Sequence, residues 1–141
     1  MITIEVCQSR EEAEKVVAGI NNYNDSQTDR ILPEVWTPID LIAKNPEGVI
    51  VGGILGGIGY YAGYMIKVLW VAEKERKSGL GAKLLEQAEA LAKEKGAKIA
   101  ILDTFSFQAE TFYLKNGYQR FGKIEDYPKK GQSFIFLKKE L

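Results

Sequence analysis

The feature that most restricts the fold is a run of 19 residues, 48–66, that contains no charged side chain. A run of this length can cross a membrane as a helix, and Gly52 and Gly56 have the small-xxx-small spacing found where membrane helices pair. The run is also rich in glycine, and each glycine costs a helix about 1 kcal/mol. β-Branched residues separated by Gly-Gly pairs are typical of twisted antiparallel strands. We therefore expect strands here and no membrane span.

Patterning along the rest of the chain predicts one domain, residues 1–141, of mixed α/β type. Ser9 and Glu12 have the spacing of a capping box at the start of a helix. Cys7, in an apolar alternating stretch, is expected to be a buried thiol. The predicted elements are, in order, a strand at 2–7, a helix from Ser9, a loop or short helix at 21–34, two or three strands between 36 and 71, a helix ending at Gly96, a strand at 97–102, a helix capped by Ser106, and strands at 118–124 and 134–138.

The composition excludes several kinds of site. The 141 residues include 19 basic and 19 acidic side chains, so no net charge favours nucleic acid or an anionic membrane. There is no histidine, which excludes Ser-His and Cys-His catalysis and disfavours a transition-metal site. Cys7 is the only cysteine, so no internal disulfide exists. Since the N-terminus also has no signal-peptide features, we predict a cytoplasmic protein.

The charges are unevenly distributed along the chain. Residues 1–66 contain 4 basic and 9 acidic side chains, and residues 67–141 contain 15 and 10. Either this is the ordinary scatter of solvated charges, or two ends of one cleft bind ligands of opposite sign. In the second interpretation the acidic segment at 21–47 borders a site for a cation.

Residues 76–82, Arg-Lys-Ser-Gly-Leu-Gly-Ala, lie between a predicted strand at 67–71 and a predicted helix. Such a turn leaves backbone N–H groups unpaired at the positive end of the helix dipole, where a phosphate or carboxylate can bind. A nucleotide P-loop needs a Gly-Lys-Ser/Thr ending, which is absent, and a dinucleotide fingerprint needs a glycine where Leu84 stands. What remains is another kind of anion-binding turn, or a glycine-rich turn without a ligand.

The pattern Arg76-x-x-Gly79-x-Gly81-Ala82 resembles the signature of the GNAT superfamily of acyl-CoA-dependent N-acetyltransferases, which follows a strand and opens a helix. Residues 109–118 are similar to a second signature of that family, a small residue four before a tyrosine and a Gly-Tyr pair closing the helix. The resemblance covers about residues 65–139. It implies a GNAT-type fold with a central, mostly antiparallel sheet, one splayed parallel pair of strands, and helices on both faces.

The same resemblance implies where acetyl-CoA binds. The pantetheine arm would lie between the strands that end at Val71 and Leu102, pairing with freed backbone groups. Backbone amides of the glycine loop would hold the pyrophosphate, because glycine lacks the Cβ that blocks close approach. Ser106 stands where many relatives have an asparagine, and no metal ligands are implied. The candidate acetyl-CoA-binding residues are Leu69, Trp70, Val71, Arg76, Lys77, Ser78, Gly79, Leu80, Gly81, Ala82, Ser106 and Ala109.

Two residues are candidates for catalysis. By the resemblance, Tyr113 donates a proton to the departing thiolate, whereas its position alone also suits a packed core aromatic. Many relatives have a glutamate on the strand before the loop, but residues 60–71 contain no carboxylate and offer Lys67 instead. Asp103 could act as general base through water or brace the following turn. No base is needed if the amine binds already neutral.

These observations predict an enzyme, an N-acetyltransferase that moves an acetyl group from acetyl-CoA to an amine by direct attack. The alternatives are a non-catalytic CoA-binding sensor or interaction module, and a glycine-turn protein for another phosphorylated ligand. The predicted partners are acetyl-CoA and an amine acceptor of cationic character, with no nucleic acid and no membrane. A homodimer is left open.

Overall fold

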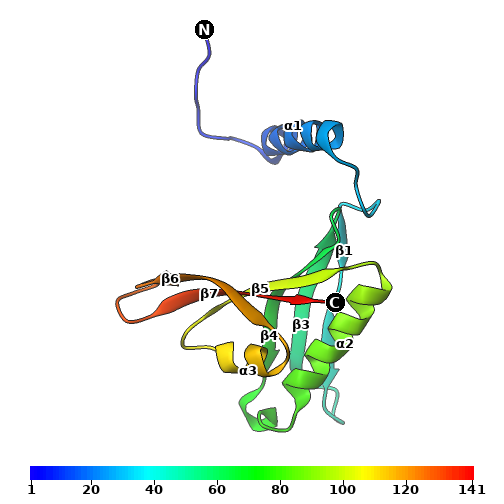
Figure 1. Ribbon diagram of the computed structural model, residues 1–141, viewed down its shortest axis with the longest axis vertical. Helices are drawn as coiled ribbons and strands as arrows, with labels where there is room; N and C mark the ends of the chain where they lie inside the picture. The colour runs from blue at the N-terminus through cyan, green and yellow to red at the C-terminus, as the bar shows by residue number, and fades with distance from the viewer. The chain divides into compact units, whose positions relative to one another are not determined.

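The computed structural model describes residues 1–141, which form two compact units, residues 1–31 and 32–141 (Figure 1). The first unit contains helix α1 (Arg10–Gln27), which begins at the predicted cap. The Glu12 N–H donates to Ser9 Oγ at 3.2 Å, and the Gln8 N–H donates to the Glu12 carboxylate at 2.8 Å. This reciprocal pairing satisfies N–H groups that the first turn leaves open. The helix continues through residue 27, so the first half of the stretch expected as loop or short helix, residues 21–27, belongs to α1.

The prediction of a strand at residues 2–7 is wrong. These residues have no strand partner, and Ile2, Ile4 and Val6 are 80–97% exposed. Cys7 is exposed rather than buried, and its thiol donates to the Ser9 carbonyl. Apolar alternation favours a strand only where another strand and a core receive it, and the chain by itself supplies neither here.

The second unit is built on a seven-stranded mixed sheet. Its strand order is β1-β3-β4-β5-β7-β6, with β2 also paired to β3, and only the β4–β5 pair is parallel. Four strands therefore lie between residues 36 and 71, where the sequence predicted two or three. The additional strand arises because two short strands, β1 and β2, both pair with β3. The strands are β1 (Trp36–Pro38), β2 (Leu41–Lys44), β3 (Ile50–Gly59), β4 (Gly63–Val71), β5 (Ile99–Phe105), β6 (Gln119–Glu125) and β7 (Ser133–Glu140).

The uncharged run forms β3, the following turn and the first part of β4, as predicted. Its glycines allow close approach within the sheet: a Cβ on Gly57 would lie 2.2 Å from the Trp36 ring, so only glycine lets the indole cross β3 there. None of the helices has both the length and the apolar character needed to cross a membrane.

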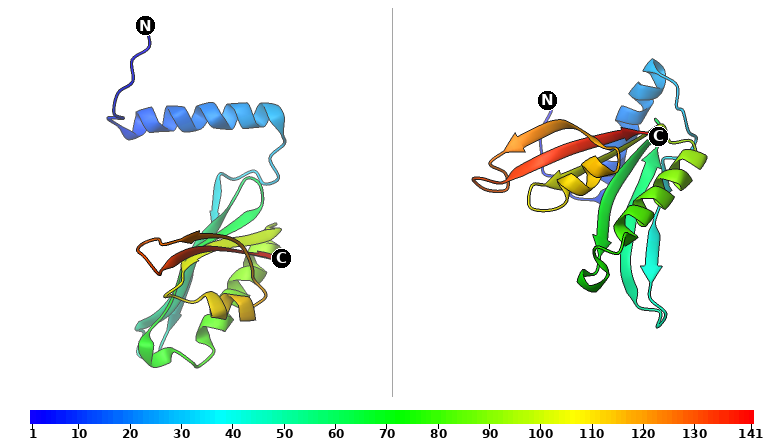
Figure 2. Two further views of the ribbon diagram at one scale, coloured as in Figure 1. Left: turned by 60° about the vertical axis from the view of Figure 1, so that its left-hand side comes forward. Right: turned by 60° about the horizontal axis from the view of Figure 1, so that its bottom comes forward.

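Two helices of the second unit pack against the sheet (Figures 1 and 2). Helix α2 (Leu80–Glu94) covers β3 and β4 and buries one apolar stripe, Leu84, Leu85, Ala88 and Ala92. The predicted stop, Gly96, has a φ of +104°. Together with the sheet, these elements confirm the predicted mixed α/β fold class.

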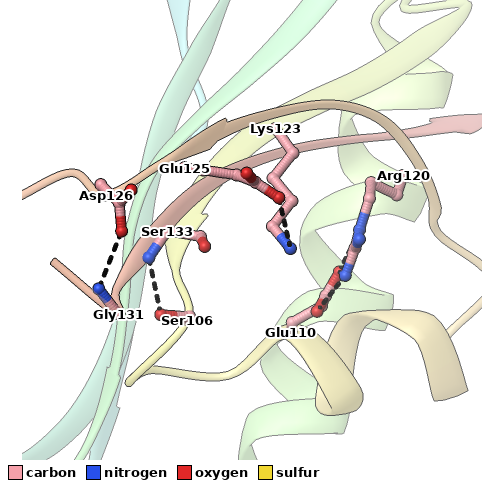
Figure 3. Close-up of polar contacts among 8 residues, drawn as sticks. All are labelled: Ser106, Glu110, Arg120, Lys123, Glu125, Asp126, Gly131 and Ser133. Atoms are coloured by element: carbon pink, nitrogen blue, oxygen red, sulfur yellow. Dashed lines mark hydrogen bonds and ion pairs between the residues drawn. The ribbon is translucent and has the colours of Figure 1, made fainter.

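Helix α3 (Glu110–Lys115) begins later than predicted. Its N-cap residue is Ala109, so the prediction that Ser106 caps it is wrong. Ser106 is instead bonded to β7 through both its backbone and its hydroxyl. The Arg120 guanidinium of β6 holds the start of α3 by two bonds of 2.7 Å to the Glu110 carboxylate (Figure 3). A short 3₁₀ helix, η1 (Glu73–Glu75), follows β4.

A polar cluster links α2 to the C-terminal strands. The Tyr118 hydroxyl donates to Glu89 at 2.6 Å, and the Lys139 ammonium donates to the same carboxylate at 2.8 Å and to the Asn116 carbonyl at 3.0 Å. Burial and the bond to Glu89 raise the pKa of Tyr118 well above its usual value, so the phenol stays neutral. Tyr118, Glu89 and Lys139 therefore each have a polar partner in this cluster.

Replacing Tyr118 by phenylalanine tests this cluster. The Glu89 side chain is 11% exposed and would keep Lys139 as its single partner, so we expect the free energy of unfolding to fall by about 1–3 kcal/mol. Urea denaturation at neutral pH measures the change. Tyr127→Phe, at a residue 48% exposed, is the matched control and should change little. Equal effects of the two substitutions would contradict the structural role of the cluster.

Candidate active site

The site begins where β4 and β5 separate. The two strands pair at three positions, Gly63–Met65 with Ile99–Ile101, and the remainder of each strand has no partner in the other (Figure 2). The ends of β4 and β5 are therefore free on their facing edges. This is the splayed parallel pair that the family resemblance implied.

Two adjoining cavities occupy this region. The larger, of about 440 Å³, lies between the end of β4, the glycine loop and α3. The smaller, of about 210 Å³, lies between the separated parts of β4 and β5. Leu69 and Tyr113 line both cavities, so the two meet at these side chains. The larger cavity is lined by Leu69, Val71, Glu75, Arg76, Lys77, Gly79, Leu80, Gly81, Ala82, Ala109, Phe112 and Tyr113.

The glycine loop turns the start of α2 toward the larger cavity. Gly79 is the N-cap residue with a φ of +86°, a conformation that strains any residue with a Cβ. The first N–H to bond within the helix is that of Lys83, to the Gly79 carbonyl at 3.1 Å. The preceding amides of the helix start have no intrahelical acceptor, and α2 has no acidic residue in its first turn. The arrangement suits an anion.

Side chains of the loop also fix its path. Arg76 Nε donates to the Val71 carbonyl at 3.0 Å, so the carbonyl at this end of β4 already accepts a hydrogen bond. Ser78 Oγ donates to the Glu75 carbonyl at 2.5 Å, and Ser78 does not line the cavities. Lys77 has a φ of +66°, which belongs to the same tight turn. Glu75 and Phe112 line the larger cavity although sequence reasoning did not select them.

Tyr113 extends from α3 to the junction of the two cavities. Its side chain is buried, with 7% of the residue exposed. Burial, and secondarily the negative charge of Asp103, raise the pKa of Tyr113 to about 12. The phenol is therefore neutral, and able to donate a proton, throughout the physiological pH range.

The smaller cavity is the more polar of the two. Asp103 and Lys67 line it from the separated strands. The Thr104 hydroxyl, which is buried, donates to Gln108 Oε1 at 3.2 Å, and the Phe105 N–H donates to the same oxygen at 2.7 Å. Sequence reasoning missed Thr104 and Gln108, whose pairing depends on the turn after β5.

Besides Ser78, two predicted cofactor-binding residues, Trp70 and Ser106, lie outside both cavities. Trp70 is 48% exposed and lines neither of them. The Ser133 N–H donates to Ser106 Oγ at 2.9 Å (Figure 3). The Ser106 N–H in turn donates to the Ser133 carbonyl at 2.8 Å. The other loop and strand residues, apart from Ser78, come together as expected. The structure contains no group of three or more His, Cys, Asp or Glu side chains placed to hold a metal ion.

Comparison with known proteins identifies the class. The sequence profile of the family described as Acetyltransferase (GNAT) domain matches residues 39–120, and the chain belongs to this family. It is therefore an acyltransferase that uses acetyl-CoA as co-substrate.

Individual relatives agree with this assignment. The chain is 34% identical over 97 residues to blasticidin-S acetyltransferase of Streptomyces morookaense, covering 68% of this chain and 71% of the relative. It is similar to the crystal structure of an acetyltransferase from Bacillus cereus ATCC 14579, with 39% identity, a TM-score of 0.87, and coverage of 99% and 98% of the two chains. An aminoglycoside 6'-N-acetyltransferase crystallised with coenzyme A shares the fold at a TM-score of 0.64 and 19% identity, with coverage of 72% and 71%.

Acetyl-CoA should stabilise the protein through the glycine loop. A ligand that binds only the folded state stabilises it by about 2.7 kcal/mol at a hundredfold excess over Kd, so the melting temperature should rise. Gly81→Val should abolish the rise, because a Cβ there already lies 3.4 Å from the Phe112 ring and further methyl groups would fill the cavity. The control is Gly59→Val, at the last residue of β3, where a Cβ would meet nothing closer than 3.9 Å. An unchanged response in Gly81→Val would refute this binding site.

Proposed function

We propose that this acetyltransferase transfers the acetyl group to the nitrogen of an amine by direct attack, with the two cavities holding the two substrates. The observation that carries the proposal is that Tyr113 lines both cavities. Acetyl-CoA would lie in the larger cavity, with its pyrophosphate on the amides of residues 77–82. The amine acceptor would enter the smaller one. The thioester carbon would then be next to the Tyr113 hydroxyl.

In this proposal the amine lone pair forms a C–N bond to the carbonyl carbon as the C–S bond breaks. The sulfur leaves as a thiolate and takes the proton of the Tyr113 hydroxyl. The phenoxide regains a proton from solvent between turnovers. The high pKa of Tyr113 keeps its hydroxyl protonated. Proton transfer from this hydroxyl to a thiolate of lower pKa is unfavourable, so the developing thiolate must be held close to it.

The proton that the amine loses has two routes in the proposed site. Asp103 lines the acceptor cavity and could accept it through water. The Lys67 ammonium on the opposite wall favours a neutral amine, because a second cation there is repelled. An amine that enters neutral can release its proton to bulk water after attack.

A cytoplasmic location, where acetyl-CoA is available, remains our prediction.

We also propose a cationic acceptor, but fewer acidic side chains are available to bind it than the charge distribution along the chain suggested. Asp40 accepts a hydrogen bond from the Gly56 N–H at 3.1 Å, and Asp25 is paired with Arg30 at 2.8 Å. Asp103 is then the carboxylate that directly lines the acceptor cavity. It would bind a second, charged amino group of the acceptor.

Free-thiol release from acetyl-CoA in the presence of a panel of amines tests the function. We expect turnover with amines. At low salt, kcat/KM should be higher for a diamine than for a monoamine that has no other charged group. This difference should shrink as salt is added, because salt screens an electrostatic preference. Asp103→Asn should remove the preference for the diamine. The absence of thiol release with every amine would refute N-acetyl transfer, and equal, salt-independent values would refute the cationic acceptor.

Tyr113→Phe isolates the proposed proton donor. The substitution keeps the ring packed and removes the hydroxyl, so kcat should fall by about 10²-fold or more while the affinity for CoA stays unchanged. Tyr127→Phe serves as control because Tyr127 lines neither cavity. Unchanged kcat in a folded Tyr113→Phe protein would leave this tyrosine a packing role.

The pH profile follows from the same group. A donor with a pKa of about 12 remains protonated as the pH rises. We therefore expect kcat to increase with pH as the bound amine loses its proton, and to show no decrease up to about pH 10. No histidine is present to add an inflection near pH 6.5. A descending limb between pH 8 and pH 10 in the wild type, absent from the residual activity of Tyr113→Phe, would contradict the assigned pKa.

A further inference from the structure

The sheet has an exposed apolar face opposite α2. A Cβ on Gly52 would point to Leu80 and Leu84 of α2, whereas one on Gly53 would point to Ile42. Side chains alternate along a strand, so the neighbours of Gly53 define an outer face on β2, β3 and β4. Its large apolar residues, each 42–55% exposed, are Ile42, Leu55, Val68 and Trp70. Contiguous apolar surface on a folded domain is typical of interaction sites.

The same side of the sheet has an open edge. Strands β1 and β2 pair with β3 and with no strand beyond them. Their outward N–H and C=O groups can therefore accept one more strand. The second unit thus lacks both a strand at this edge and a cover for its outer face.

Residues 1–31 carry the complementary features. Residues 2–7 alternate apolar and polar side chains as an edge strand does, and nothing pairs with them. In α1, apolar residues at helical spacing form one stripe, and none of the helix is buried. The stripe residues, 53–75% exposed, are Val16, Val17, Ile20 and Tyr23.

Charge and size agree with docking between these parts. Residues 1–31 hold six acidic and three basic side chains, whereas residues 32–141 hold 13 acidic and 16 basic. The two units therefore have net charges of opposite sign. A docked segment of about 25 residues also has the size of a standard protein interface on one partner.

The connection between the units favours exchange between copies. Leu32 is fixed to the sheet by its N–H, which donates to the Tyr60 carbonyl at 2.9 Å. Residues 28–31 connect the two units and can span about 14 Å at most. Short hinges of this kind favour the exchange of an element between identical chains.

We propose that the protein is an exchanged dimer. Residues 2–7 of each copy add a strand to the β1–β2 edge of the other, and the α1 stripe covers the outer face of that other copy. Because Val68 belongs to this face and also lines the acceptor cavity, the second copy's α1 would lie next to the acceptor site.

The mass in solution, measured by light scattering during size-exclusion chromatography, tests the dimer. We expect the wild type to be dimeric and Val16→Asp/Ile20→Asp to be monomeric with its fold retained. Ala18→Asp/Asn22→Asp adds the same charges to the opposite side of α1 and should remain dimeric. A monomeric wild type, or a dimer that survives Val16→Asp/Ile20→Asp, would overturn the proposal.

Mixing two defective variants distinguishes exchange from any other dimer. The double variant Ile42→Asp/Leu55→Asp damages the outer face and should also be monomeric. If this double variant has a reduced melting temperature, the single variant Ile42→Asp is used in its place. Equal amounts of the α1 variant and the face variant should form a mixed dimer, because one undamaged α1 then meets one undamaged face. A mixture that remains monomeric would overturn exchange.

Discussion

The separation of β4 from β5 is the constraint on which the rest of the site depends. Three parallel pairs hold the strands together, and beyond them each strand keeps its other neighbour, β3 or β7. The sheet thus remains continuous while one internal gap opens. The glycine loop lies at the end of β4, and Tyr113 enters from α3. Both cavities exist because no backbone ladder fills this gap.

The sequence predicted those parts of the site that depend on local chemistry. The glycine turn before α2 and the unpaired amides at the start of that helix follow from residues adjacent in the chain. The position of Tyr113 came from a family pattern rather than from its own spacing. The structure adds the physical reason, since the side chain stands where two cavities meet.

The errors share a cause, which is dependence on residues distant in the chain. Ser106 has the composition of a helix cap, but a strand 27 residues later bonds it instead. Thr104 and Gln108 attracted no attention because their pairing needs the turn that follows β5. Residues 2–7 have a strand pattern without a partner in the same chain. A local pattern gives a propensity, and tertiary pairing decides whether it is realised.

The central claim is that the gap and the glycine loop together hold acetyl-CoA. Backbone amide NMR spectra recorded during titration with CoA test it at the level of single residues. The account predicts that the largest shift changes occur at the amides of residues 77–82 and at Leu69 and Val71 on the free edge of β4, with smaller changes at Ala109 and Tyr113. Changes concentrated elsewhere in the sheet, with the loop amides unaffected, would contradict it.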